Sequence, residues 1–216
     1  LQLQLNSFDK VDLHPLNQST FVSFTHTFVS VTYDDLRPDN GKFHIWNTDG
    51  RKIASSPPDL SPLTHLIALS DNQFVTASVD GLLCIWNEEG TIKNKFYPNE
   101  PHSPIKALAK IDDTRFAFAL NNGQVYFYDT KNNSYKLFLE CISGHVWDIE
   151  NLGDEQFAVK HRDSNTSSSG YEEANFTVYD CKSTTTIGTL EGFSIMKCPA
   201  GEFLTGNVDG AGRCGA

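Results

Sequence analysis

His145 and Asp148 lie close together in the segment SGHVWDI (143–149), and a histidine beside a carboxylate is a pairing that general acid–base catalysis uses. Catalysis would also need a nucleophile or a second carboxylate at a fixed spacing from this pair, and the sequence has neither. Among the 7 histidines, no two have the spacing of a metal motif. We therefore expect no catalytic residue, no metal site and no cofactor.

The cysteines and glycines also give no sign of a chemical centre. The sequence has 5 cysteines, irregularly spaced and without a C-x-x-C pair, which predicts buried free thiols in a reducing compartment. The segments NNGQ and VDGAG contain glycine turns, but they lack the strand-to-helix setting of a phosphate-binding loop.

Charge and hydropathy exclude two classes of partner. The formal net charge of −10, with no cluster of more than two Lys or Arg, argues against nucleic acid. No run of about eighteen apolar residues could cross a membrane, and the start LQLQLNSFDK lacks the features of a signal peptide. We therefore expect a cytoplasmic protein that binds neither nucleic acid nor a membrane.

Two sequence markers recur with almost the same period, and they define the elements that position these residues. The first marker is mostly aromatic, is followed by Asn or Asp, and falls at Leu5, Trp46, Trp86, Tyr128 and Tyr179, with separations of 41, 40, 42 and 51 residues. The second is a Phe at positions 28, 74, 116, 157 and 203, with separations of 46, 42, 41 and 46. Two markers that share one period indicate an internal repeat.

Each repeat reads as four short strands. In the third copy these are IKALAKI, RFAFAL, QVYFYD and YKLFLEC, separated by turn residues such as NNG. In RFAFAL, large residues alternate with alanine, as expected for a strand covered on both faces and more closely approached on one. Four antiparallel strands every forty-odd residues predict an all-β fold, a β-propeller built of four-stranded blades.

The copies resemble the WD-repeat (WD40-like) family through SGHVWDI at 143–149, TASVDG at 76–81 and IWN at 45–47 and 85–87. In that family a His, a strand Ser or Thr, a turn Asp and a Trp form a hydrogen-bond network within each blade. The residues that the resemblance assigns to this structural motif are Thr76, Asp80, Gly81, Trp86, Trp46, Gly41, His102, His145, Gly123, Tyr128 and Tyr179. The repeats are degenerate, because no copy has the full set and Pro62 stands near the position of the second blade's His.

The repeat also predicts the domain organisation, a single propeller domain over residues 1–216. Residues 1–13 resemble the end of a preceding blade, 192–216 the start of a further one, and the blades between them span about 14–54, 55–101, 102–143 and 144–191. Two arrangements remain open. We favour an incomplete window from a propeller of about six to eight blades over a five-blade ring whose ends share one blade.

Candidate binding residues lie on the turns and strand ends of one face, because propeller strands are used for packing. The distance between the two markers is 12 residues in copies two and three but 18 and 22 in copies one and four, which places insertions at 32–40 and 161–175. The candidates for partner binding are Trp147, Tyr33, Tyr171, Asp34, Asp35, Asp39, Lys106, His65, Glu172 and Glu173. The alternatives are tolerated loop insertions, a modified 161–175 loop, a Trp147 packed between blades, and solvated rim positions for Lys106 and His65.

We expect a non-catalytic protein–protein interaction scaffold that presents the propeller rim to a protein or peptide with a basic or mixed-charge surface. The first alternative is a propeller enzyme of hydrolase type with its site in the central channel. That enzyme would need carboxylates on several channel-lining strands, and only VWDIENL has any. The second alternative is a purely structural domain of a larger multidomain protein.

Overall fold

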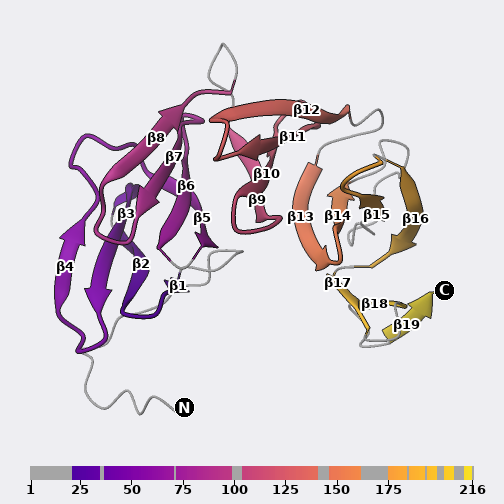
Figure 1. The fold of residues 1–216 in the computed structure, drawn as a ribbon, viewed down its shortest axis with the longest axis horizontal. Helices are drawn as coiled ribbons and strands as arrows, with labels where there is room; N and C mark the ends of the chain where they lie inside the picture. The colour runs from indigo at the N-terminus through magenta and orange to yellow at the C-terminus, as the bar shows by residue number, and fades with distance from the viewer. Residues whose placement is uncertain are drawn as a thin grey trace.

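The computed structural model describes residues 21–34, 37–70, 72–98, 104–140, 146–161, 175–183, 185–192, 194–198, 202–206 and 212–215. Every regular element in these residues is a β-strand, and the strands form five antiparallel sheets that follow one another in chain order (Figure 1). The expected strands in residues 1–13 lie outside the described residues.

The sheets are numbered here by their order along the chain. Sheet 1 contains β1 (Phe21–Ser23), β2 (Thr27–Asp34), β3 (Arg37–Asn47) and β4 (Lys52–Ser55). Sheet 2 contains β5 (Leu63–Ser70), β6 (Gln73–Ser78), β7 (Leu83–Asn87) and β8 (Ile92–Phe96). Sheet 3 contains β9 (Ile105–Lys110), β10 (Arg115–Leu120), β11 (Gln124–Asp129) and β12 (Ser134–Glu140).

The last two sheets continue the pattern. Sheet 4 contains β13 (Val146–Gly153), β14 (Gln156–His161), β15 (Asn175–Asp180) and β16 (Thr186–Glu191). Sheet 5 contains β17 (Ser194–Lys197), β18 (Phe203–Gly206) and β19 (Gly212–Gly215). Each sheet is an antiparallel meander, and the first strand of one sheet contacts the first strand of the next, from β1 through β5, β9 and β13 to β17. We call these five the inner strands.

Apolar layers between successive sheets form the core. Sheets 1 and 2 share a layer that includes Phe43, Phe74 and Trp86, all fully buried. Strand β10 serves two layers, because Phe116 and Phe118 pack toward sheet 2 while Ala117 and Ala119 pack toward sheet 4. All four side chains are fully buried, which confirms that both faces of this strand are covered.

The first insertion differs from the expected loop. In the backbone, residues 32–34 belong to β2 and 37–40 to β3, and the register joins Thr32 to Lys42 and Asp34 to Arg37. Residues added on both sides of an antiparallel connection can continue the ladder, which satisfies their backbone donors and acceptors without a loop. Gly41 therefore lies inside β3, whereas Gly81 and Gly123 occupy turns with φ of 82° and 84°.

Candidate functional site

Three successive inner strands carry an irregularity at the same register position. In β5 the pairing steps from Leu63–Ser78 to His65–Ala77, in β9 from Ile105–Leu120 to Ala107–Ala119, and in β13 from Val146–His161 to Asp148–Lys160. Each strand thus has one extra residue that the partner strand does not match, which is the definition of a β-bulge. The extra residues are Thr64, Lys106 and Trp147, and we call them the bulge row.

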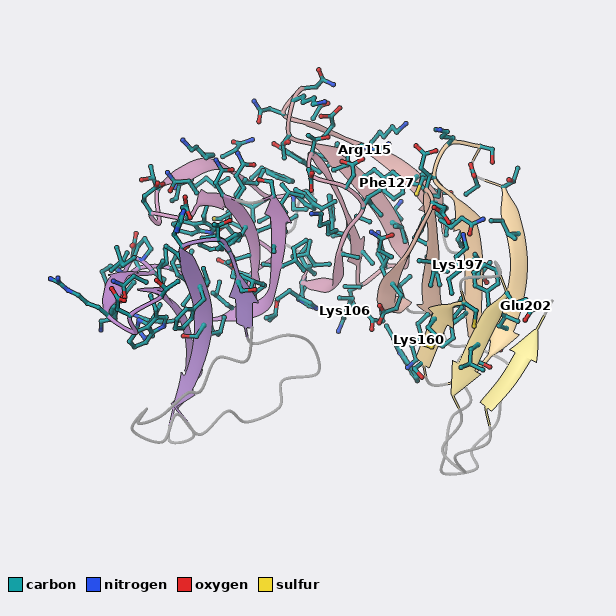
Figure 2. All side chains as sticks on the ribbon, turned by 60° about the horizontal axis from the view of Figure 1, so that its bottom comes forward. Lys106, Arg115, Phe127, Lys160, Lys197 and Glu202 are labelled. Carbon is teal, nitrogen blue, oxygen red and sulfur yellow. The ribbon has the colours of Figure 1, made fainter. Side chains whose placement is uncertain are left out.

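The bulge row lies at one end of the sheets. The first residue of each of these inner strands pairs with the last residue of the second strand, and in sheets 2 and 3 the turns containing Gly81 and Gly123 follow at once. The bulge row therefore shares a face with the turns between second and third strands. Figure 2 shows Lys106 and Lys160 toward this end and Arg115 toward the opposite one.

The side chains of the bulge row differ in exposure and chemistry. Trp147 is 39% exposed, Lys106 is exposed and Thr64 is half-buried. A bulge turns a side chain out of the regular alternation of its strand, and such positions are frequent beside functional sites. This end of the inner strands therefore offers an aromatic ring, a cation and a hydroxyl in order around three neighbouring sheets.

His65 lies between the first two positions of the row. Its Nδ1 lies 2.9 Å from Thr64 Oγ1, and its ring lies near Lys106 on the neighbouring sheet. Burial lowers the pKa of His65 to about 4; the nearby backbone of Lys106 works against this shift and the Lys106 charge adds to it. At neutral pH the ring is therefore uncharged.

Strand β13 carries carboxylates beyond Trp147. Partial desolvation raises the pKa of Glu150, the nearby Asp148 charge adds to this shift, and Lys160 opposes it. The Lys160 ammonium lies 5.4 Å from the centre of the Phe176 ring, close enough for a cation–π contact. In the register of the inner strands, Asp148 and Glu150 correspond to His65 and Ile67 on β5, so the carboxylates are confined to sheet 4 among these strands.

Asp80 organises the turn that flanks the bulge row in sheet 2. It accepts hydrogen bonds from the hydroxyls of Ser78, Ser61 and Tyr97 and from the backbone N–H of Leu82. Partial burial works to raise the pKa of Asp80, but these hydrogen bonds outweigh it and lower the pKa below its usual value. The resemblance to the WD-repeat family implies a His near position 62 that bonds to the turn Asp. In this chain Ser61, beside Pro62, makes that contact with Asp80 instead.

The strand-closing Trp residues bond within their own sheets. Trp86 Nε1 donates to Thr76 Oγ1 at 2.9 Å, and Trp46 Nε1 donates to Ser30 Oγ at 2.8 Å. In sheet 3 the residue equivalent to Thr76 is Phe118, which offers no hydroxyl. Tyr128 there accepts a hydrogen bond at 2.6 Å from Asn94 on β8 of the preceding sheet.

Tyr128→Phe should therefore lower the free energy of unfolding by about 0.5–1.5 kcal/mol, because it removes the hydroxyl that accepts from Asn94 and donates to Asn133, while the stacking of the ring on Phe96 is kept. Chemical denaturation would measure the change. Tyr126→Phe is the matched control, since its part-buried hydroxyl bonds to Gln124 within sheet 3. An equal or larger loss in the control would contradict the importance of the bond between sheets.

The other predicted site residues are not brought together with the bulge row by the described structure. Tyr33, Asp34 and Asp39 belong to β2 and β3, and their side chains are not described. The residues that lie outside the described ranges are Asp35, His102, His145, Tyr171, Glu172 and Glu173. Within the described ranges, His, Cys, Asp and Glu nowhere gather in a group of three that could hold a metal ion, and no helix suitable for crossing a membrane occurs there.

Comparison with known proteins shows the fold. The structure is similar to the WD40 β-propeller domain of Doa1, with a TM-score of 0.64 and 15% sequence identity over 90% of this chain. The chain spans 62% of the length of that structure. No protein-family model and no curated protein sequence matches the chain. The predicted fold class is confirmed: the chain is all-β, with successive four-stranded antiparallel sheets, and its fold is similar to that of a WD40 β-propeller domain.

Proposed function

We propose that this propeller is a non-catalytic interaction module that binds a segment of a partner protein across the bulge row, with Trp147 as its apolar anchor. The observation that carries the proposal is the repeated bulge at equivalent positions on β5, β9 and β13, where Lys106 and Trp147 are exposed and Thr64 is half-buried. A large aromatic ring that is partly exposed in the free protein and becomes covered in a complex is a typical source of binding energy.

The proposed partner carries a basic or mixed-charge surface. Net charge of −10 disfavours a strongly acidic partner, and Asp148 and Glu150 lie beyond Trp147 on β13. The sequence adds acidic residues at Asp34, Asp35, Asp39, Glu172 and Glu173. In this proposal the carboxylates attract basic groups and mainly increase the association rate, which salt reduces.

The residue types on the inner strands support binding over catalysis. A channel enzyme would place carboxylates or histidines at equivalent positions on several inner strands. At the position of Asp148, strands β5 and β9 have His65 and Ala107, and at the position of Glu150 they have Ile67 and Ala109. Only one of these strands therefore carries carboxylates at these two positions.

Trp147→Ala tests the proposal. Peptides selected from a displayed random library against the parent protein should bind the variant at least about tenfold more weakly, because the anchor is lost. The free energy of unfolding should fall by less than about 1.5 kcal/mol, since the ring is already partly exposed. Binding would be measured by fluorescence anisotropy and stability by chemical denaturation.

Leu137→Ala is the matched control, because Leu137 is 44% exposed but lies on the outer strand β12. It should leave peptide binding unchanged. Equal loss of binding in both variants, or none in Trp147→Ala, would remove the bulge row from the contact surface. A library that yields no binder would favour a purely structural domain.

A further inference from the structure

Lys106 lies next to a neutral polar group. The half-buried ring of His65 contacts the Thr64 hydroxyl through Nδ1 and lies near Lys106 on the neighbouring sheet. Because the ring is neutral, it adds no charge of its own to the surface. The Lys106 side chain is exposed.

No described acidic side chain pairs with Lys106. The ion pairs found in the described residues join Lys110 to Asp113, Arg115 to Asp112, Lys182 to Glu155, and Lys197 to Asp154. All of these acidic partners lie in the turns between first and second strands, at the opposite end of the sheets from the bulge row. Within the described chain, Lys106 is thus an uncompensated cation whose neighbours in the row are a hydroxyl and an indole ring.

We propose that Lys106 selects a carboxylate on the bound segment, so that the partner presents an Asp or Glu side chain next to the apolar residue that covers Trp147. This inference rests on the proposed function, and it specifies the part of a mixed-charge segment that lies over sheets 3 and 4. A single ammonium beside one hydroxyl matches the single charge of a carboxylate. A phosphate carries up to two charges and is usually bound by several cations, commonly Arg.

The acidic groups of this protein would then contact a different part of the same segment. Asp148 and Glu150 lie on the face of β13 that is turned away from sheet 3, because their strand neighbour Ile149 faces the layer shared with sheet 3. A segment running from sheet 3 to sheet 5 therefore meets a cation, then an aromatic ring, then carboxylates. Its complementary order is acidic, apolar, basic.

The probes for the test are fluorescent heptapeptides Gly-Ser-Gly-Xaa-Phe-Gly-Ser and their Phe-Xaa counterparts, with Asp, Asn, Lys or phosphoserine as Xaa. The parent protein should bind the better Asp peptide about two- to fivefold more tightly than the Asn peptide, a ratio typical of a partly exposed ion pair. The ratio should shrink as salt is raised. Phosphoserine should give no further gain over Asp.

Lys106→Met should bring the Asp-to-Asn ratio to about one while the Asn peptide keeps its affinity. Lys110→Met is the matched control: it removes a charge from the same strand, but at the end where Lys110 pairs with Asp113, so the ratio should be kept. Both variants should be checked for unchanged melting temperature.

The outcomes separate the two proposals. Peptides that bind through Trp147 with equal affinity for Asp and Asn would overturn carboxylate selection and leave the proposed function standing. A ratio that survives Lys106→Met, or a stronger phosphoserine peptide, would also overturn it. If no peptide of the set binds, carboxylate selection at this site is overturned, while Trp147-dependent binding of library peptides would still support the proposed function.

Discussion

Trp86→Ala should lower the free energy of unfolding by about 3–5 kcal/mol. Trp86 is fully buried, its ring is 4.8 Å from that of Phe43 on sheet 1, and it stacks on Phe74 at 6.1 Å. Truncation removes most of a large side chain from the layer between two sheets and leaves a cavity there. It also leaves the Thr76 hydroxyl, itself 1% exposed, without the indole donor.

Equilibrium denaturation of Trp86→Ala and Trp86→Phe would separate these contributions. The Phe variant keeps an aromatic ring but loses the hydrogen bond to Thr76, so its loss should be clearly smaller than that of the Ala variant. Trp147→Ala provides the exposed comparison. If Trp86→Ala cost no more than Trp147→Ala, the layer between sheets 1 and 2 would not be the packed core that the structure describes.

The second large effect is a loss of stability in acid through His65. Its pKa falls from 6.5 in the unfolded chain to about 4 in the folded one, chiefly because of burial. Since the unfolded chain then binds the proton more strongly, the contribution of the neutral ring is complete above about pH 6.5. It is lost as pH falls toward 4, by about 2–3 kcal/mol between pH 7 and pH 4.5.

Comparison with His65→Gln isolates this contribution, because glutamine can hydrogen bond to the Thr64 hydroxyl but does not titrate in this range. At neutral pH the variant should have a lower free energy of unfolding than the parent. Between pH 7 and pH 4.5 its free energy of unfolding should fall less steeply than that of the parent. Denaturation curves at a series of pH values would measure both slopes. Parallel curves for parent and variant would contradict the buried, neutral state of the ring.

The repeat could be predicted from the sequence because it is recorded in side-chain types. The Phe and aromatic markers fall at Phe74 and Trp86, and these two residues pair directly across β6 and β7. The spacing of such markers follows from the strand length and the turn. It is therefore the same in the third copy, where Tyr128 stands at the position of Trp86 in the second. Trp147 and Lys106 are candidates from the sequence alone, because they stand near the starts of strands that the repeat predicts.

The bulge row could not be predicted as a set. Thr64, Lys106 and Trp147 share no side-chain property, and a bulge is a feature of backbone pairing that depends on the partner strand. The contact of Ser61 with Asp80 could not be predicted either. The family pattern has a His at this place, and a serine one residue before Pro62 is too common in turns to indicate the same contact.

The hydrogen bond between Tyr128 and Asn94 restricts how this array can change by recombination. Trp46 and Trp86 bond to residues of their own sheets, so a duplicated or transplanted sheet carries both partners with it. Tyr128 donates to Asn133 in the turn before β12, but its shorter bond is to Asn94 of the preceding sheet, and a copy of sheet 3 inserted elsewhere would meet a different residue at the position of Asn94. The stability of sheet 3 therefore depends on which sheet precedes it in the chain. Exchanging sheets 2 and 3 would break the hydrogen bond between Asn94 and Tyr128, which needs one residue from each sheet.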